Sequence, residues 1–400
     1  MGYGEQLLFE DQELFPEDKA GIQGLSLENL GDIFPIKQRR CYLNTASIGA
    51  LCHPVIGAVD RFMADVRDNG RNHYPDWCRY ADSVIKSRIA QLIGGRPSEI
   101  AFIKNTTEGL NFVANGLRWI EGDNIVIADI EYPSNVYCWM RLKQRGVQLR
   151  WIKNREGRIL VDDLRAAMDD RTRLVSLSAV QFSNGYRHDI AATASLCRER
   201  KALLNLDGIQ WVGALEIDVE QLGVDFLSAG GHKWLLAPIG TGFFYCRSSS
   251  LELLDPPVVG YHSVDKREDH MDYELVYRRD AGRFEEALVN FTGIWGLDAA
   301  VRIQLLLGSK QIEQHILALT LMAAEGLQRL GYRLISPWAA AERSGILSFR
   351  HPVIVAEDIA SRLKEAGVDL ATRGGALRIS PSFYNDRKEV DRFLDALPLA

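Results

Sequence analysis

The sequence predicts a two-domain α/β protein, with a large domain built on a mostly parallel sheet and a smaller α+β domain after it. Short apolar runs alternate with amphipathic stretches through the middle of the chain, which indicates buried parallel strands with helices on both faces. The 400 residues also exceed the ~250–300 at which one hydrophobic core stops growing. The apolar runs lie at 101–103, 125–128, 174–179, 203–206, 224–227 and 242–245.

The pattern changes after residue 290, where a smaller domain is expected. Apolar residues recur at helical spacing from Ile312 to Leu330, and Gly331 follows as a C-cap. The segments that complete this domain are a strand near 345–350, a helix near 357–366, a strand at 376–380 and a final helix around 390–397. The predicted organisation is an N-terminal segment 1–40 that packs on the small domain or a partner, a large domain 41–290 and a small domain 291–400.

Composition and charge exclude several classes of protein. The chain carries 47 Lys and Arg against 53 Asp and Glu, a net charge of −6, which argues against nucleic acid as the main partner. No stretch approaches the ~18 uninterrupted apolar residues of a membrane helix, and the acidic N-terminus does not match a secretory signal. The six cysteines form no CxxC pair, so we expect no metal site, no disulfide framework and a reducing, cytoplasmic location.

The first signal of chemistry is the start of the helix predicted after the strand at 101–103. Asn105 is a good N-cap, and Glu108 three residues later completes a capping-box pattern. Unpaired N–H groups at a helix N-terminus, with the hydroxyls of Thr106 and Thr107 beside them, suit a phosphate. On its own, however, this pattern more often marks only the beginning of a helix.

The second signal is a carboxylate at the end of a predicted strand. Asp207 ends the apolar run 203–206, and Gln210 follows three residues later. The carboxyl end of a buried parallel strand is where α/β sheets bind ligands, and a carboxylate there needs a positive partner such as a protonated ring nitrogen. A carboxylate that caps the next helix is an equally good interpretation of this residue alone.

The third signal is Lys233, which follows Gly230, Gly231 and His232 and precedes Trp234. Small residues let the backbone approach a ligand closely. Partial desolvation by apolar neighbours lowers the pKa of a lysine, as an amine that forms an imine requires. The alternative is an exposed lysine in a turn, which this apolar setting disfavours.

The order of these signals, with Lys233 26 residues after Asp207, resembles the pyridoxal-phosphate enzymes of the aspartate-aminotransferase fold. Within them it resembles the class V aminotransferase family, which includes cysteine desulfurases, selenocysteine lyases and isopenicillin N epimerase. The shared motifs are Thr-Thr-Glu-Gly, Asp-Gly-x-Gln and Gly-His-Lys, and the resemblance runs from Tyr42 to Asn385. It implies fold type I of pyridoxal-phosphate-dependent transferases, pyridoxal 5'-phosphate as cofactor, a small amino-acid substrate, and a homodimer with active sites near the interface.

The resemblance also implies roles for single residues. Lys233 would hold the cofactor covalently, release it to the substrate amine and move protons afterwards. Asp207 would pair with the protonated ring nitrogen, and Gln210 would bond the phenolic oxygen of the ring. Tyr132 would stack on the ring, and Asn184 would lie near the substrate and the ring oxygen.

The phosphate of the cofactor would be held by Thr107 and His232, with help from Thr106. Two positions depart from the family here. A family serine shortly before the His-Lys pair is Gly230 in this chain, and a family threonine that reaches the phosphate of a neighbouring subunit is Leu288. Some of the phosphate contacts must therefore come from other residues.

Arg378 is the leading candidate for binding the substrate carboxylate. Alternation along its strand sends Leu377 and Ile379 to one face and Arg378 to the other, and a guanidinium binds a carboxylate bidentately. The family places its α-carboxylate arginine in this strand, although alternation alone fits a surface arginine equally well. Arg373 is the second candidate.

Other departures narrow the expected activity. Persulfide-forming desulfurases need a mobile cysteine near the C-terminus and stack a histidine on the ring, whereas no cysteine follows Cys246 here and Tyr132 takes the histidine's place. We therefore expect a C–S lyase that eliminates a β-substituent, or an epimerase, acting on an α-amino acid, with an aminotransferase as the alternative. A non-catalytic sensor of the cofactor would carry a DNA-binding domain, and neither end shows a helix-turn-helix or basic stretch.

Overall fold

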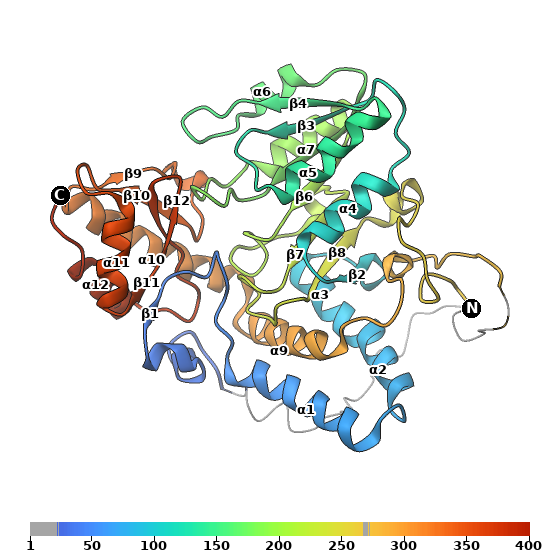
Figure 1. Cartoon of the computed structure of the whole chain (residues 1–400), viewed down its shortest axis with the longest axis horizontal. Helices are drawn as coiled ribbons and strands as arrows, with labels where there is room; N and C mark the ends of the chain where they lie inside the picture. Colours follow the sequence, from blue (N-terminus) through green and yellow to red (C-terminus); the bar gives the residue numbers. More distant parts are fainter. Residues whose placement is uncertain (1–21, 23, 267–270, 272) are drawn as a thin grey trace.

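The structure, a computed structural model, describes residues 22, 24–266, 271 and 273–400 and contains a seven-stranded and a four-stranded sheet (Figure 1). The larger sheet is parallel except for β8, which runs antiparallel to both of its neighbours. The prediction of a mostly parallel sheet is thus confirmed. From edge to edge its strands are β2 (Ile100–Ile103), β8 (Gly242–Cys246), β7 (Phe226–Gly230), β6 (Leu203–Asp207), β5 (Thr172–Ser178), β3 (Asn124–Ala128) and β4 (Gln148–Ile152).

Strand β4 is absent from the sequence prediction. It lies at the edge of the sheet, and only its last residue, Ile152, is buried. A strand with one covered face and a free edge lacks the continuous apolar run that marks the central strands. Trp151 illustrates this, because it points outward and remains largely exposed.

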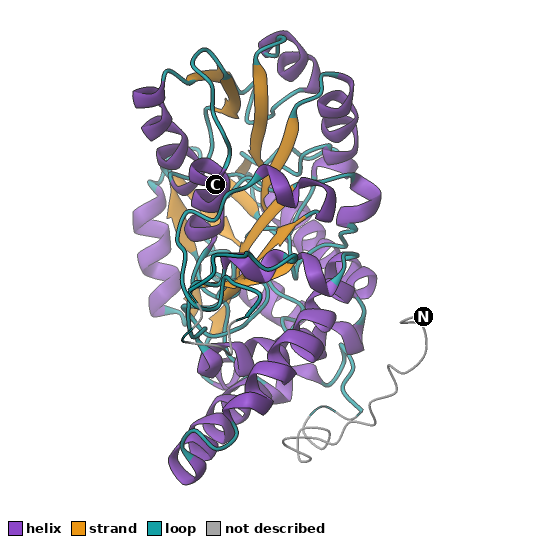
Figure 2. Ribbon diagram, turned by 90° about the vertical axis from the view of Figure 1, so that its right-hand side faces the viewer, coloured by secondary structure: helices purple, strands orange, loops and turns teal. Residues whose placement is uncertain are grey.

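Helices cover both faces of the larger sheet (Figure 2). Along β3, Ile125 and Ile127 pack into one apolar cluster, while Val126 between them packs into another, as the two-residue period of a strand requires. The helices of the first cluster are α4 (Thr106–Gly116) and α5 (Ser134–Met140). Those of the second include α1 (His53–Asn69), α3 (Lys86–Ile93), α7 (Ile190–Glu199) and α9 (Phe291–Leu307). Three short helices complete this part, namely α2 (Tyr74–Tyr80), α6 (Val161–Ala167) and α8 (Val219–Leu222).

The smaller sheet is antiparallel and lies in the C-terminal part of the chain, at the left of Figure 1. Its strands in spatial order are β12 (Ala371–Arg373), β13 (Ala376–Ile379), β10 (Leu347–Arg350) and β9 (Arg333–Leu334). The accompanying helices are α10 (Ser309–Arg329), α11 (Ala356–Glu365) and α12 (Arg387–Asp395). A separate parallel pair joins β1 (Cys41–Tyr42) to β11 (Val368–Asp369). Each element predicted after residue 300 therefore has a counterpart in the structure.

The N-terminal chain packs against the C-terminal elements where it is described. Lys37 forms ion pairs with Asp386 at 2.9 Å and Glu389 at 2.6 Å, and Phe34 stacks on Tyr384 with ring centroids 4.3 Å apart. Of the segment predicted over 1–40, residues 1–21 and 23 lie outside the described residues. The boundaries at 40 and 290 stay predictions, and α9, the first helix after residue 290, packs against α1 and α3.

The connections of the larger sheet change direction at β3. From β3 the chain passes to β4 on one side, and then β5, β6 and β7 follow one another on the other side. Loops that leave neighbouring strands in opposite directions open a ligand site in α/β sheets. Tyr132 in the loop after β3 and Phe182 in the loop after β5 face each other there, with ring centroids 5.1 Å apart. None of the helices among the described residues is long and apolar enough to cross a membrane.

The packing of α4 on β7 predicts opposite outcomes for two helical glycines. A Cβ at Gly109 of α4 would overlap the Ser228 hydroxyl and lie 3.0 Å from the Ser228 Cβ. A Cβ at Gly57 of α1 would meet only the flexible end of Arg61. Gly109→Ala should therefore lower the free energy of unfolding by about 1–3 kcal/mol. Gly57→Ala should leave it unchanged or raise it by up to about 1 kcal/mol.

Urea denaturation of both variants checks this expectation. Equal midpoints for Gly109→Ala and Gly57→Ala would show that α4 does not pack this closely on β7.

Candidate active site

Lys233 lies in the turn that follows β7, close to the carboxyl end of β6. The residue is half-buried, so the alternative of an exposed turn lysine is wrong. Burial lowers the pKa of Lys233 to about 8, with Arg378 and Arg373 adding to the effect and Asp207 opposing it. The amine lies 5.6 Å from the centroid of the Tyr132 ring. A lysine in this setting is neutral in a larger fraction of molecules than an ordinary lysine at the same pH.

Asp207 is the last residue of β6 and is only 3% exposed. Its Oδ1 accepts a hydrogen bond of 3.0 Å from the Ile209 amide. Burial raises the pKa of Asp207 to about 6, while the Ile209 amide and Lys233 oppose the shift. This bond lies in a turn, and the next helix, α8, begins only at Val219 with Asp218 as its N-cap, so the interpretation that Asp207 caps the next helix is wrong. The carboxylate instead faces the charge of Lys233.

The N-terminus of α4 has the cap that the sequence predicts. Asn105 Oδ1 accepts a 3.0 Å bond from the Glu108 amide. The reciprocal bond differs from the prediction, because Glu108 accepts from the Lys104 amide at 2.6 Å and not from that of Asn105. Lys104 also pairs with Glu108 through its side chain at 2.7 Å, which draws the carboxylate one residue back along the chain. The helix therefore starts at Thr106, as the cap requires.

Thr106 and His232 meet around Gly230. The Thr106 hydroxyl accepts a 3.0 Å bond from the Gly230 amide. A Cβ at Gly230 would lie 3.2 Å from the His232 ring and 3.3 Å from Thr106 Oγ1. A serine at this position would press on both groups, which gives a physical reason for the glycine. Burial lowers the pKa of His232, with Lys233 adding to the shift, so its imidazole is neutral. Thr107 donates a 2.8 Å bond to Ser134 at the start of α5.

Gln210 links the N-terminal chain to the turn that carries Lys233. Its Nε2 donates to the Ala46 carbonyl at 3.0 Å, and its Oε1 accepts from the Trp234 indole at 2.7 Å. Because an amide nitrogen carries two hydrogens, one N–H of Gln210 remains for a ligand. The fully buried Trp234 ring fixes the orientation of this amide.

Asn184 and Tyr132 differ in how closely they join the rest of the predicted site. Tyr132 is 45% exposed and contacts both Lys233 and Phe182. Asn184 is buried, donates to the Gly157 carbonyl at 2.8 Å and accepts from the Tyr186 amide at 3.0 Å. Within the part of the chain that the structure describes, no contact links Asn184 to Lys233 or Asp207.

Arg378 comes from the small sheet and is 1% exposed, so the surface-arginine alternative is wrong. It donates to the Phe182 carbonyl at 2.6 Å and to the Ser47 hydroxyl at 2.8 Å. Its Nε is buried and has no hydrogen-bond partner among the described residues. Burial lowers the pKa of Arg378 to about 10, and Arg373 adds to the effect. Arg373 is exposed at the end of β12.

The chain segment after β1 is a part of the site that sequence reasoning missed. Ala46 and Ser47 accept bonds from Gln210 and Arg378, and the Gly49 amide donates 2.7 Å to the His232 carbonyl. A Cβ at Gly49 would overlap the Lys233 carbonyl oxygen, so this close approach needs a glycine. The small residues Ala46, Ser47, Gly49 and Ala50, which surround Ile48, were the signal that could have identified the segment.

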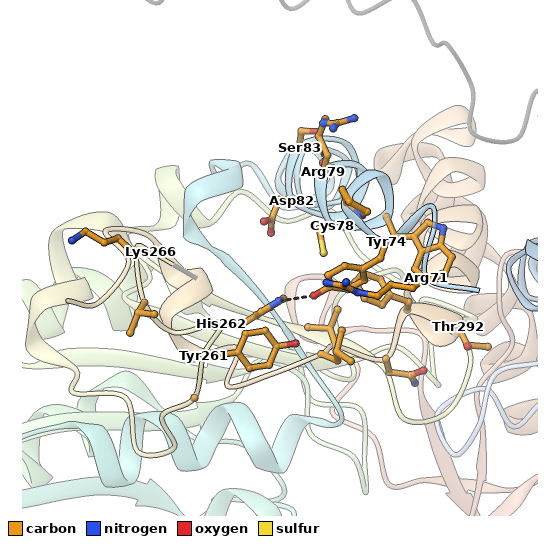
Figure 3. A pocket seen from close by; sticks show the side chains of 18 of the residues that line it. Arg71, Tyr74, Cys78, Arg79, Asp82, Ser83, Tyr261, His262, Lys266 and Thr292 are labelled. Carbon is orange, nitrogen blue, oxygen red and sulfur yellow. Dashed lines mark hydrogen bonds between the residues drawn. The ribbon is translucent and has the colours of Figure 1, made fainter. Parts of the chain in front are cut away.

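A separate cavity of about 1510 Å³ opens between α1, α2 and the loop that connects β8 to α9 (Figure 3). The Tyr74 hydroxyl and His262 Nε2 lie 3.2 Å apart on its wall. Lys233, Asp207 and Arg378 do not line this cavity, whereas Leu288 does. The cavity is therefore distinct from the site around Lys233.

Comparison with known proteins agrees with the geometry. The family model for class-V aminotransferases matches residues 41–393. A probable cysteine desulfurase of Methanothermobacter thermautotrophicus is 31% identical over 387 residues, which covers 89% of this chain and 93% of that protein. The apo structure of a cysteine desulfurase from Thermococcus onnurineus NA1 superposes with a TM-score of 0.84 at 26% identity, covering 92% of this chain and 96% of that one.

A further solved structure shares the fold. It is a mutant of C-DES in which glycine is covalently linked to the PLP cofactor, with a TM-score of 0.84, 23% identity and coverage of 91% of this chain and 97% of that one. The chain has fold type I and belongs to the class-V aminotransferase family of pyridoxal-phosphate-dependent enzymes that act on amino acids.

Proposed function

We propose that the protein is a C–S lyase that eliminates a sulfur-linked β-substituent from an α-amino acid. The observation that carries this proposal is the convergence of Lys233, Asp207 and Arg378 in a chain without a cysteine after Cys246. Relatives named cysteine desulfurases support an amino acid with a sulfur at its β-carbon as the substrate. A lyase needs the proton transfers of such an enzyme and no thiol of its own.

The cysteines near the site do not supply the thiolate that a desulfurase needs. Cys138 lies close enough to Asp207 to be influenced by its charge, but burial is the main cause that raises the pKa of its thiol to about 12. Its Sγ donates to the Ser134 carbonyl at 3.3 Å. A buried, protonated thiol of this kind is not a nucleophile at neutral pH.

The residues of the site fit pyridoxal phosphate. Asp207 is a buried carboxylate with a raised pKa, and a protonated ring nitrogen would supply the positive charge that it lacks. At the other end of the site, the N-terminal N–H groups of α4, the Thr106 and Thr107 hydroxyls and neutral His232 suit a phosphate. Lys233 follows His232 directly in the chain, and its charge acts on Asp207. We assign the ring nitrogen to Asp207, the phosphate to α4 and His232, and the covalent link to Lys233.

Four side chains then have separate roles in the elimination. Pyridoxal phosphate supplies an electron sink for the α-carbon when it is bound. Arg378 binds the α-carboxylate, Tyr132 covers the ring, and Asp207 keeps the proton on the ring nitrogen. Lys233 would take the α-proton once the substrate amine has replaced it in the covalent link, and would pass a proton to the departing sulfur as the C–S bond breaks, so that the sulfur leaves as a thiol. Lys233 would then re-form its own link and release the unsaturated amine. In solution that enamine becomes an imine, which water hydrolyses to a 2-keto acid and ammonia.

Epimerisation and transamination begin with the same loss of the α-proton and differ only in where a proton returns. We therefore expect products, and not binding, to separate these three reactions. With S-methyl-L-cysteine or L-cystine, the purified holoenzyme should release pyruvate and ammonia, measured by mass spectrometry. Lys233→Ala should reduce the rate by roughly 10²–10⁴-fold, as loss of a general base does.

Other products would contradict the lyase proposal. Exchange of the substrate α-hydrogen for solvent deuterium with inversion and no keto acid would establish an epimerase. With L-cysteine, which has a free thiol, alanine together with a protein persulfide would establish a desulfurase. Cofactor converted to its amine form would establish an aminotransferase.

The lowered pKa of Lys233 makes cofactor attachment depend on pH. The neutral amine is the form that attacks an aldehyde, so the rate of covalent reconstitution of the apoenzyme should rise as the pH passes about 8. Arg378→Gln removes a positive charge that lowers this pKa and should move the midpoint to higher pH. Arg378→Lys keeps the charge and serves as the control.

Stopped-flow absorbance of the attachment reaction measures these midpoints, with circular dichroism to verify that each variant is folded. A midpoint at the ordinary value for lysine in the unmodified chain, or equal midpoints in the two variants, would show that Arg378 does not act on this amine.

We further propose that a second copy of this chain covers the face around the 1510 Å³ cavity. Large apolar side chains are exposed there, including Met63 at 53% and Leu288 at 61%. Apolar patches of this kind mark interaction sites. Leu288 also stands where the family resemblance implies a residue that reaches the neighbouring subunit.

A charge placed in this patch should weaken the dimer. Sedimentation equilibrium should show a dimer for the unmodified chain and at least a tenfold higher dissociation constant for Leu288→Glu, because a buried unpaired carboxylate is costly. Val353→Glu, at an exposed site in the C-terminal part, is the control. A fully active monomer, or a dimer unaffected by Leu288→Glu, would contradict this proposal.

A further inference from the structure

We propose that the substrate carries a second acidic group besides its α-carboxylate, and that Arg373 binds this second group. The inference rests on the proposed function, because it concerns the substrate of the same site. It names a chemical class: α-amino acids whose side chain, beyond the sulfur, ends in a carboxylate or an equivalent anion.

The hairpin of β12 and β13 places both arginines on one face of the small sheet. In its register Ala371 pairs with Arg378, and Arg373 pairs with Ala376. Directly paired residues in an antiparallel sheet share a face, and so do residues two apart along one strand. Arg373 and Arg378 are therefore diagonal neighbours on the same face, and Arg378 on that face is bonded to Phe182 and Ser47 of the site.

Neither the enclosed Arg378 nor the exposed Arg373 has a carboxylate partner of the kind that enclosed cations elsewhere in the described chain have. Arg88 pairs with Asp298 at 2.8 Å, and buried Lys86 pairs with Glu285 at 3.0 Å. Arg378 instead bonds a carbonyl and a hydroxyl, and Arg373 bonds the Thr372 carbonyl at 2.8 Å. Among the described residues, neither guanidinium forms an ion pair.

The charge balance of the site therefore calls for more than one anion. Arg373 lies close enough to lower the pKa of both Lys233 and Arg378, so three positive groups share this region. Asp207 is the carboxylate that opposes them at Lys233, and the ring nitrogen of the cofactor is its proposed partner. One α-carboxylate on the buried Nε of Arg378 compensates one guanidinium and leaves Arg373 uncompensated.

The two arginines differ in solvent exposure, and we therefore assign them to different groups of the substrate. Arg378 is enclosed and can reach only a group held deep in the site, next to the α-carbon. Arg373 is exposed at the end of its strand and can meet a group that extends outward. An amino acid with an acidic group at the far end of its side chain would span both positions. A second anion of this kind also raises specificity, since an uncharged analogue leaves Arg373 without a counter-ion.

Pairs of ligands that differ only in one charge test this inference. L-Glutamate and L-glutamine have no β-leaving group, so their binding to the holoenzyme is independent of whether the enzyme is a lyase. S-Carboxymethyl-L-cysteine and S-carbamoylmethyl-L-cysteine form the corresponding pair with a sulfur. Affinities are measured from the cofactor absorption band and from the rise in thermal midpoint with ligand concentration.

We expect the acid of at least one pair to bind tenfold or more tightly than its amide. Arg373→Gln should lower the affinity for that acid close to the level of the amide and change the affinity for the amide much less, and Arg373→Lys should restore part of the preference. Arg333→Gln, at an exposed arginine of the same sheet, makes an identical change in net charge and should have no effect.

Two results would overturn the inference: equal affinity for acid and amide in both pairs, or a preference that persists in Arg373→Gln. These outcomes are distinguishable from failure of the lyase proposal. Suppose that glutamate is preferred over glutamine through Arg373 but neither cysteine derivative yields pyruvate. The inference of a second acidic group would then be supported, and the proposed reaction class would be wrong.

Discussion

The opposed charges of Lys233 and Asp207 are the constraint on which the rest of this site depends. Burial favours the neutral form of each group, because it lowers the pKa of the lysine and raises that of the carboxylate. The charge of each group opposes this effect by stabilising the charged form of the other. Such groups persist in a protein interior only when the backbone holds them in place and a ligand or partner uses them. Here the hydrogen-bonded ends of β6 and β7 supply that rigidity, since Asp207 pairs in register with Ser228.

The site belongs to both sheets. The large sheet supplies Lys233, Asp207 and the start of α4, and the small sheet supplies Arg378, which reaches the loop after β5 through the Phe182 carbonyl. The segment after β1 runs between them and bonds to Gln210 and Arg378. Arg378, the proposed substrate clamp, and Lys233, the proposed reactive amine, are therefore connected through a few polar contacts of this segment.

Local patterns allowed most of the fold to be predicted. Continuous apolar runs identified the central strands, and Asn105 identified the start of α4, because both features are decided by residues close in sequence. Edge strand β4 was missed because its exposed residues give no such run. Contacts between residues far apart in the sequence could not be predicted, because no local pattern encodes them. The burial of Arg378 depends on elements far apart in the chain, and so does the close approach of Gly49 to Lys233.

The assignment of the cofactor to Lys233 is tested most directly by chemical trapping and peptide mapping. The purified holoenzyme is treated with borohydride, digested, and searched by mass spectrometry for a lysine that carries the reduced pyridoxyl group. The account predicts a single modified peptide, containing Lys233 between His232 and Trp234. Modification of a different lysine, or none at all in protein that retains the cofactor, would contradict it.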